Sequence, residues 1–214
     1  MKTNIISFLI LAGLLIVFPG KAEGPKSDQA TNSKDVTLYE VNVEDSQVEW
    51  TGQKIVYSHN GTVELSQGEL KMEGNKLVGG YFELEMNTIE NLDLEDPKDN
   101  QKLVNHLKSK DFFDVKKYPK AIFEVTKAIE ETNGENNYLL TGDLTIKGIT
   151  RPLSFPARLE MEDETIKASA TMTFDRSEYE IKYKSGSFFE NLGDNIIYDD
   201  VEMSIKLIAS KSSS

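Results

Sequence analysis

The sequence predicts an all-β, mainly antiparallel fold of about eight strands, closed as a barrel or packed as a sandwich, with one short helix. From Val36 onwards, apolar residues alternate with Glu, Lys, Thr and Ser, as in antiparallel strands that bury one face. Turn-forming pairs at Asn60-Gly61, Gly74-Asn75 and Asn133-Gly134 interrupt the alternation, and their spacing is typical of barrels and sandwiches. Of these, Asn60-Gly61 is expected to form a tight hairpin turn.

The N-terminal segment differs in composition from the rest. Lys2 precedes a mostly apolar run, Ile5 to Phe18, and small residues surround a cleavage point after Ala22. This pattern predicts a secretory signal peptide over residues 1–22 and export to the periplasm or the medium. The run is shorter than the roughly 20 residues of a spanning helix, although a retained anchor stays an alternative. Residues 23–35 are polar and lack periodicity, which predicts a flexible linker.

The chain is acidic and contains no cysteine. Its formal net charge is −12, from 36 acidic and 24 basic residues. Such a charge repels nucleic acid and anionic lipid surfaces, so nucleic-acid binding is not expected. Without cysteine, thiol catalysis, Cys-ligated zinc and lipid attachment through an N-terminal cysteine are excluded. An exported domain without disulfides depends on its hydrophobic core for stability.

The folded domain is expected to run over residues 36–209, followed by a polar tail at 210–214. Residues on one phase of a strand face the same side of the sheet. The apolar phases that we expect to point inward are Thr37/Tyr39/Val41/Val43, Val48/Trp50, Phe82/Leu84/Met86, Phe123/Val125, Tyr138/Leu140/Leu144/Ile146, Leu153/Phe155/Leu159/Met161, Ile166/Ala168/Ala170/Met172/Phe174 and Val201/Met203/Ile205/Leu207/Ala209.

One segment breaks the alternation. Asp96-Pro97 supplies an N-cap followed by proline at the first helical position, and Leu103 and Leu107 recur at helical spacing. We therefore expect one short helix over residues 97–109, packed on or across the strands. Phe112-Phe113, which follows it, is expected to plug the barrel end or to hold the helix in place.

The hairpin segment at residues 141–155 carries two cations, a glycine and a hydroxyl between Lys147 and Arg151. A phosphate-binding loop joins a strand to a helix whose N-terminus receives the phosphate. Here one alternating segment leads directly into another. We therefore interpret the segment as a hairpin turn, with Leu144 and Leu153 inside the barrel and the cations at its rim.

No common catalytic constellation is present in the sequence. It lacks G-x-S-x-G, G-x-G-x-x-G and G-x-x-x-x-G-K-[ST] motifs. His59 and His106 lie far apart in the sequence and without the spacing of H-E-x-x-H, so both are predicted to be structural and no metal site is expected. Acid pairs such as Asp199-Asp200 are expected to be solvated, although glycosidase-type paired carboxylates stay an alternative.

One charged residue lies on an inward phase. The phase that ends at Phe174 continues to Arg176 if the strand stays regular. An inward arginine at a strand end could grip the polar head group of a ligand by bidentate hydrogen bonds. Alternatively, Arg176 pairs with a nearby acid or with free carbonyls and closes the end of the barrel.

An ordered set of motifs connects the sequence to a known family. The motifs are Ser46–Gly52, Gly79–Phe82, Leu107–Val115, Tyr118–Phe123, Gly142–Pro152 and Phe174–Ser177. In this order and spacing they resemble the YceI-like family of exported bacterial lipid-binding proteins, over the whole predicted domain. One departure is Glu180, which stands where a small residue, usually glycine, is common in that family.

The resemblance implies a lipocalin-like barrel around an apolar tunnel, which in this family is associated with polyisoprenoid chains and isoprenoid quinones. Alternation does not decide whether the middle of a barrel is hollow or filled by its own side chains, so each tunnel candidate is equally a core candidate. The candidates are Trp50, Phe82, Leu84, Met86, Phe123, Tyr138, Leu140, Leu144, Ile146, Phe155, Met172, Phe174, Met203 and Ile205.

The function that the resemblance implies is non-catalytic binding, sequestration or transport of an isoprenoid lipid. No cofactor is expected apart from such a lipid or quinone, and no stable membrane span is expected after signal cleavage. A homodimer is left open. Two other functions stay alternatives: a hydrolase acting on a lipid or sugar with paired Asp and Glu residues, and a ligand-free envelope stress-response interaction module.

Overall fold

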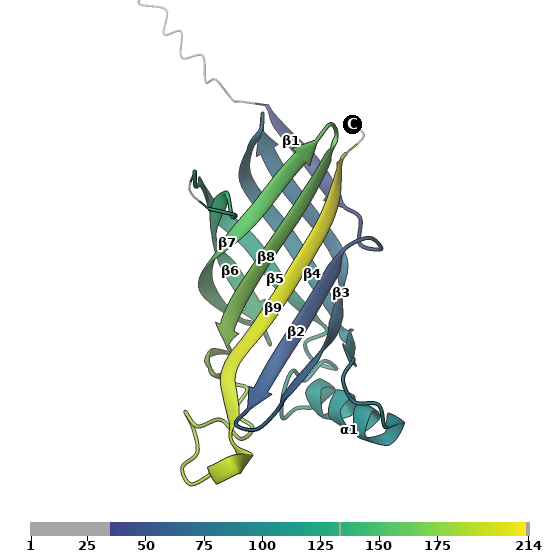
Figure 1. Cartoon of the computed structure of the whole chain (residues 1–214), viewed down its shortest axis with the longest axis vertical. Helices are drawn as coiled ribbons and strands as arrows, with labels where there is room; N and C mark the ends of the chain where they lie inside the picture. Colours follow the sequence, from purple (N-terminus) through teal and green to yellow (C-terminus); the bar gives the residue numbers. More distant parts are fainter. Residues whose placement is uncertain (1–34, 133, 213–214) are drawn as a thin grey trace, which may run out of the picture. The chain divides into compact units, whose positions relative to one another are not determined.

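Nine antiparallel strands and one α-helix make up the domain in the computed structural model, which describes residues 35–132 and 134–212 (Figure 1). The elements are β1 (Val36–Val41), β2 (Gln47–Lys54), β3 (Ser58–Glu73), β4 (Lys76–Asn91), α1 (Pro97–Lys108), β5 (Lys120–Glu130), β6 (Tyr138–Ile146), β7 (Ile149–Glu162), β8 (Thr165–Asp175), the 3₁₀ helices η1 (Arg176–Tyr179) and η2 (Gly193–Asn195), and β9 (Ile197–Lys211). The predicted signal peptide, the linker up to residue 34, Asn133 and the last two tail residues lie outside the described residues.

The sheet closes on itself. Its strand order is β1-β3-β2-β9-β8-β7-β6-β5-β4, and a further pairing of β3 with β4 joins the two sides. Both β1 and β2 pair with β3 on one side and with β9 on the other, so they occupy one position in succession. The result is a closed antiparallel barrel with eight strand positions, which confirms the predicted fold and selects the barrel over the sandwich.

The end of the barrel that carries the β3–β4 and β7–β8 turns is the upper end in Figure 1. Buried side chains fill this end. Met72 lies directly opposite Leu77 and Ile166 opposite Ala209, and each of the four is at most 2% exposed. The hydroxyl of Tyr138 accepts a hydrogen bond from the Leu77 N–H at 3.2 Å. These five residues form what we call the upper plug.

The lower end carries two long connections. One joins β4 to β5 and contains α1; the other, residues 176–196, joins β8 to β9. Helix α1 begins where the sequence predicts: the Asp96 side chain accepts hydrogen bonds from the N–H groups of Lys98 and Asp99, and Ser109 is the C-cap. Strand β9 extends to Lys211, two residues into the segment predicted as a tail.

The predicted hairpin turn at Asn60-Gly61 is wrong. Both residues lie inside β3, and the turn between β2 and β3 occupies residues 55–57. Gly61 lies opposite Trp50 on β2, and a Cβ added to Gly61 would come within 1.8 Å of the Glu90 carbonyl oxygen on β4. The glycine therefore permits close approach of three strands, a role that glycine also has within sheets.

Other turns are as predicted. Gly74-Asn75 joins β3 to β4, and Lys147-Gly148 joins β6 to β7, with φ of 52° and 73° at its two residues. Positive φ at both central positions is typical of a type I′ hairpin. Glu180 has φ of 58°, a left-handed conformation that glycine adopts most readily. The turn is therefore kept despite the departure from the family pattern.

Substitution of Gly61 tests this close approach. We expect Gly61→Ala to lower the free energy of unfolding by about 1–3 kcal/mol, because the added methyl group overpacks the β2–β3–β4 contact. Gly52→Ala on β2 is the matched control, since a Cβ there meets no atom within 4 Å. Urea denaturation measures both variants, and equal stabilities for the two would contradict the interpretation.

Candidate functional site

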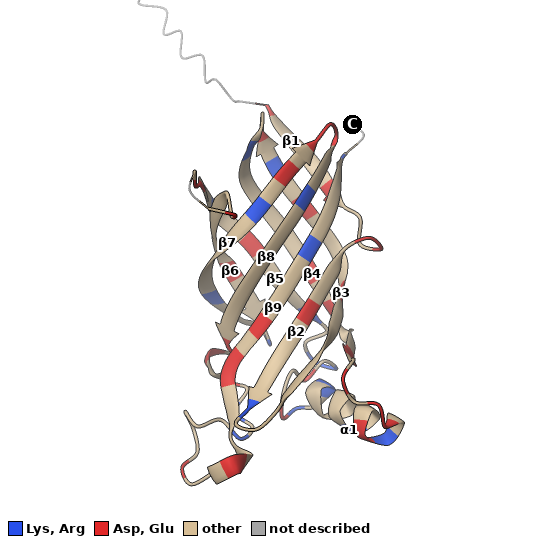
Figure 2. Cartoon of the chain, in the orientation of Figure 1, with Lys and Arg blue, Asp and Glu red and all other residues tan. Residues whose placement is uncertain are grey.

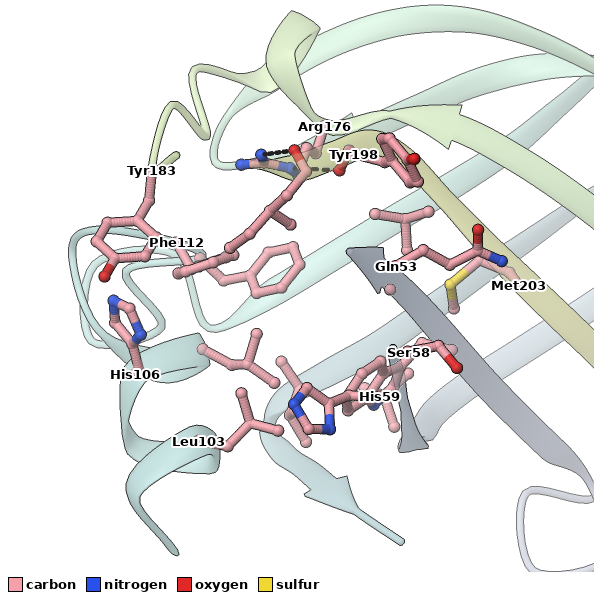
Figure 3. A pocket seen from close by; sticks show the side chains of 18 of the residues that line it. Gln53, Ser58, His59, Leu103, His106, Phe112, Arg176, Tyr183, Tyr198 and Met203 are labelled. Carbon is pink, nitrogen blue, oxygen red and sulfur yellow. Dashed lines mark hydrogen bonds between the residues drawn. The ribbon is translucent and has the colours of Figure 1, made fainter. Parts of the chain in front are cut away.

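A cavity of about 740 Å³ occupies the lower half of the barrel. Its mouth lies between α1, the turn that joins β2 to β3, and the β8–β9 connection (Figure 3). The volume lies within the roughly 300–1,000 Å³ of small-molecule sites. A second cavity of about 80 Å³ lies towards the upper plug, and its wall shares Leu84, Leu144 and Met172 with the first. The barrel is therefore hollow below and filled above.

Most of the predicted tunnel candidates line these two cavities. The large cavity is lined by Trp50, Leu84, Met86, Leu144, Ile146, Met172, Phe174 and Met203. The small cavity alone is lined by Phe82, Phe123, Phe155 and Ile205. Tyr138 and Leu140 line neither and belong to the packed core. Whether any of the fourteen contacts a ligand stays a prediction.

Glycines in the strands make room for aromatic rings against the barrel wall. A Cβ added to Gly142 would lie 2.5 Å from Cζ of Phe123, and one added to Gly80 would lie 3.2 Å from the ring of Phe82. The two phenylalanines are also directly opposite each other on β4 and β5. Because the rings lie over bare backbone, the centre of the barrel stays open.

Aromatic side chains from both lower connections line the mouth. The His106 ring on α1 lies 4.9 Å from the Phe112 ring and 4.4 Å from the Tyr183 ring, both edge to face, as Figure 3 shows. Phe112 is buried and, with Phe113, lines the cavity, in agreement with a plug at this end. His106 was predicted to be structural, but its contact with Tyr183 was not predicted, because only the fold brings α1 and the β8–β9 connection together.

A histidine and a carboxylate meet at the mouth. Nδ1 of His59 lies 2.8 Å from Oδ2 of Asp93, and the Asn60 N–H donates to Oδ1 at 2.9 Å. Burial raises the pKa of Asp93, but hydrogen bonds from the Asn60 N–H, His59 and Asn91 outweigh burial and hold the pKa below its ordinary value. With Nδ1 occupied, only Nε2 of His59 remains to contact a ligand.

Arg176 lies in the cavity wall, but its guanidinium binds the protein. The side chain is buried; Nε donates to the Tyr198 carbonyl at 3.1 Å, Nη1 to Ile181 at 2.8 Å and Nη2 to Ile197 at 3.0 Å. Asp199 Oδ1 lies 3.0 Å from Nη2, an ion pair outside hydrogen-bond geometry. These contacts match the alternative in which arginine closes the barrel end. The head-group role of Arg176 stays a prediction.

Asp199 is not the solvated acid that we expected. Its Oδ2 accepts hydrogen bonds from the hydroxyls of Ser185 and Ser187, at 2.8 and 2.7 Å. Ser185 is fully buried. Asp199 and Arg176 together therefore hold the β8–β9 connection against the start of β9. Breaking a buried ion pair would leave an uncompensated charge, so the pair resists separation.

The lysine of the β6–β7 hairpin also serves the fold. Lys147 Nζ donates to the Glu180 carbonyl at 3.0 Å, which ties the hairpin to the residue with the left-handed backbone. Burial lowers the pKa of Lys147, while Asp114, Tyr118 and Glu180 oppose this shift. The hairpin interpretation of residues 141–155 is confirmed.

In residues 35–132 and 134–212, no group of three or more His, Asp or Glu side chains is placed to hold a metal ion. Within the same residues, no helix is both long and apolar enough to cross a bilayer.

Comparison with known sequences gives a family match. A model of the YceI-like domain matches residues 39–209. A UPF0312 protein of Photorhabdus laumondii is 37% identical over 106 residues, 50% of this chain and 53% of that protein. A UPF0312 protein of Pseudomonas putida is 41% identical over 83 residues, 36% of this chain and 42% of that protein. The chain thus spans about half the length of the curated relatives it matches.

Solved structures share the fold. BcnA of Burkholderia cenocepacia is 22% identical, with a TM-score of 0.64 over 79% of this chain and 99% of that one. A polyisoprenoid binding domain from Saccharophagus degradans, implicated in plant cell wall breakdown, is 10% identical, with a TM-score of 0.58 over 82% of this chain and 99% of that one. At these identities the likeness shows the fold alone.

The pKa shift of Asp93 predicts a dependence of stability on pH. Because this pKa is lower in the folded chain, ionised Asp93 stabilises the fold above its unfolded-state pKa of about 3.9, and the contribution is lost as pH falls through the folded value. Asp93→Asn should lower the free energy of unfolding by about 1 kcal/mol at neutral pH. Urea denaturation should show the gap to wild type closing in acid. Glu131→Gln, at an exposed position, is the control; a gap that widens in acid would contradict the assignment.

Removal of the Arg176 guanidinium should be severe. Arg176→Met leaves three carbonyls and the Asp199 carboxylate without their partner, and we expect a loss of about 3–5 kcal/mol in unfolding free energy. Arg158→Met, at an exposed arginine on β7, should change stability by less than about 0.5 kcal/mol. If Arg176→Met does not fold, Arg176→Met with Asp199→Asn should recover part of the loss. Similar stabilities for Arg176→Met and Arg158→Met would refute the role.

Proposed function

This chain belongs to the YceI-like domain family, and from that membership we propose that it is a non-catalytic carrier that binds an isoprenoid lipid inside its barrel. One observation carries the proposal: a large cavity with apolar walls fills the lower half of a barrel whose upper half is solid. The likeness to a solved domain described as polyisoprenoid binding supports it at the level of the fold.

The cavity suits a long branched hydrocarbon. Its inner wall consists of Leu, Ile, Val, Met, Phe and Trp side chains, and each CH₂ group buried there contributes about 0.8 kcal/mol. Methionines such as Met86, Met172 and Met203 adapt to irregular shapes better than branched residues do. A prenyl chain, with a methyl branch on every unit, is a ligand of that kind.

Apart from Arg176, whose guanidinium is bound by the protein itself, the charged groups of the cavity lie at its mouth. Lys54, His59, Asp93, Lys102 and Lys184 all come from the lower end. A bound lipid would therefore have its tail against the upper plug and its head between these groups. A quinone ring and a polyprenyl head group both fit this orientation, and the proposal covers both.

The acids at the mouth favour binding over hydrolysis. Asp93 and Asp99 both line the cavity. Asp93 has both oxygens engaged, and its low pKa keeps it ionised, which makes it a poor general acid. Asp99 lies in the first turn of α1, where a carboxylate stabilises the helix dipole. A cavity of this size also favours a carrier over a ligand-free interaction module.

We further propose that the protein acts after export, in the periplasm or the medium, because of the signal-peptide pattern at residues 1–22. Native mass spectrometry of protein purified from its own host tests both proposals. The mass should correspond to a chain without residues 1–22, and extraction should release a stoichiometric prenylated lipid or quinone.

A matched pair of variants connects the lipid to the cavity. Leu144 lines both cavities, while its neighbour Thr145 is hydrogen-bonded to Thr150 outside the barrel. Leu144→Trp should lower the affinity for a prenyl quinone at least about tenfold, the effect of excluding two CH₂ groups. Thr145→Trp should leave the affinity unchanged. Empty host protein that also refuses added prenyl lipids would overturn the carrier function.

A further inference from the structure

Large apolar side chains are exposed around the mouth of the cavity. They lie on the β2–β3 turn, on the β8–β9 connection and at the start of β9, and each is 42–70% exposed. We call them the apolar rim: Ile55, Val56, Tyr57, Phe188, Phe189 and Tyr198. Tyr57 and Tyr198 also line the cavity, so the rim is continuous with the apolar interior. Contiguous apolar surface of this kind marks an interaction site.

Lysines lie on the aromatic rings at the mouth. Nζ of Lys54 is 4.9 Å from the centre of the Tyr57 ring, and Nζ of Lys182 is 4.7 Å from that of Phe188. Nζ of Lys184 is 5.5 Å from the centre of the Tyr183 ring. In the described residues, neither Lys54 nor Lys184 is within ion-pair distance of a carboxylate. Their charges therefore remain available to an anionic group outside the protein.

The upper end differs in part. Lys76 pairs there with Glu130 at 2.9 Å, and Lys167 pairs with Glu162 at 2.7 Å, as Lys182 pairs with Glu180 at the lower end. Figure 2 shows the β7–β8 turn at the upper end as acidic. Exposed apolar residues near it, such as Ile129, lie on strands of the barrel wall instead of loop tips. Figure 2 also shows acidic residues at the lower end, on η2 and at the start of β9. What distinguishes the lower end is therefore its exposed apolar loop residues together with Lys54 and Lys184, which pair with no carboxylate of the described residues.

We propose that the apolar rim docks on the surface of a lipid bilayer that contains anionic lipids. Side chains with an apolar body and a cationic neighbour are suited to the boundary between head groups and acyl chains. The net charge of the chain repels such a surface, but screening limits that repulsion to about 8 Å at physiological salt. Within that distance Lys54 and Lys184 favour contact and the exposed Glu190 and Asp194 oppose it, so the apolar rim determines the orientation of the docked protein.

The purpose of this docking, which is lipid transfer, rests on the proposed carrier function. Each CH₂ group of a lipid that enters water is disfavoured by about fourfold, so a long chain does not pass through water at a useful rate. With the rim seated among the head groups, the mouth faces the acyl layer. The lipid then moves from bilayer to barrel without crossing water.

The absence of cysteine allows a direct test with a single label. In the full chain, Val56→Cys and, as control, Asn75→Cys in the upper β3–β4 turn each receive a nitrobenzoxadiazole fluorophore. Vesicles are an equimolar mixture of phosphatidylglycerol and phosphatidylcholine, without isoprenoid. A blue shift and protection from aqueous quenchers at position 56, with neither at position 75, is the expected result.

Variants assign the binding to the rim. Lys54→Gln should weaken vesicle partitioning about fivefold, and Phe189→Ser about tenfold. Ile129→Ser, on the outer wall of the barrel, should leave it unchanged. Added salt should weaken partitioning of the wild type more than that of Lys54→Gln, because the lysine contribution is screened.

Three outcomes would overturn the docking. They are absence of vesicle binding, equal responses at positions 56 and 75, and protection of position 56 only through contact with a second protein molecule. Because the vesicles contain no isoprenoid, these results are independent of the cavity. A protein that carries a lipid by native mass spectrometry but ignores vesicles would refute the docking and leave the carrier function standing.

Discussion

Closure of the sheet by the β3–β4 pairing is the constraint on which the rest of the structure depends. Once eight strand positions form a ring, every inward side chain must share one lumen, and the volume of those side chains decides whether a given level is solid or hollow. At the upper end, Met72, Leu77 and Ile166 fill the lumen. Lower down, the rings of Phe82 and Phe123 lie over glycines at the wall, and a cavity remains.

The same closure places the polar chemistry. A closed barrel has no free strand edge with unpaired backbone N–H and C=O groups. Backbone groups that still need side-chain partners therefore lie where the strands end, and polar side chains gather there. At the lower end the two long connections bring Asp93 to His59 and Asp199 to Arg176. The first pair lies at the mouth and the second in the wall. Both join segments that are remote in sequence, and so the site and its support form together when the connections settle on the barrel.

Periodicity was enough to predict most of the strands and most of the inward set, because alternation is a local property of the chain. It was wrong for Val43, which lies beyond β1, and for Met161, near the end of β7, since both are exposed, and it did not identify the inward face of β3. The capping pair Asp96-Pro97 predicted where the helix begins, since an N-cap depends on adjacent residues only. The turn predicted at Asn60-Gly61 was wrong, because Gly61 instead lies inside a strand and permits the close approach of its neighbours. Composition alone cannot distinguish the two uses of glycine. The pairing of His59 with Asp93 could not be predicted either, and the acid expected beside Arg176 could not be identified as Asp199, because these partners are set by how the connections fold back. The hollow interior depends on packing at each level, which no local pattern encodes.

The β4–β5 and β8–β9 connections enter the mouth from opposite sides of the eight-position ring. Both are nevertheless hydrogen-bonded to the strands beside them: the Pro119 carbonyl accepts from the Met86 N–H at 2.7 Å, and the Lys184 carbonyl accepts from the Ile197 N–H at 2.9 Å. The entrance is therefore made of segments that are fixed to the barrel, and the contacts of Arg176 that hold one of them also stabilise the fold. A substitution that loosens a connection should change the shape of the entrance and the stability of the barrel together.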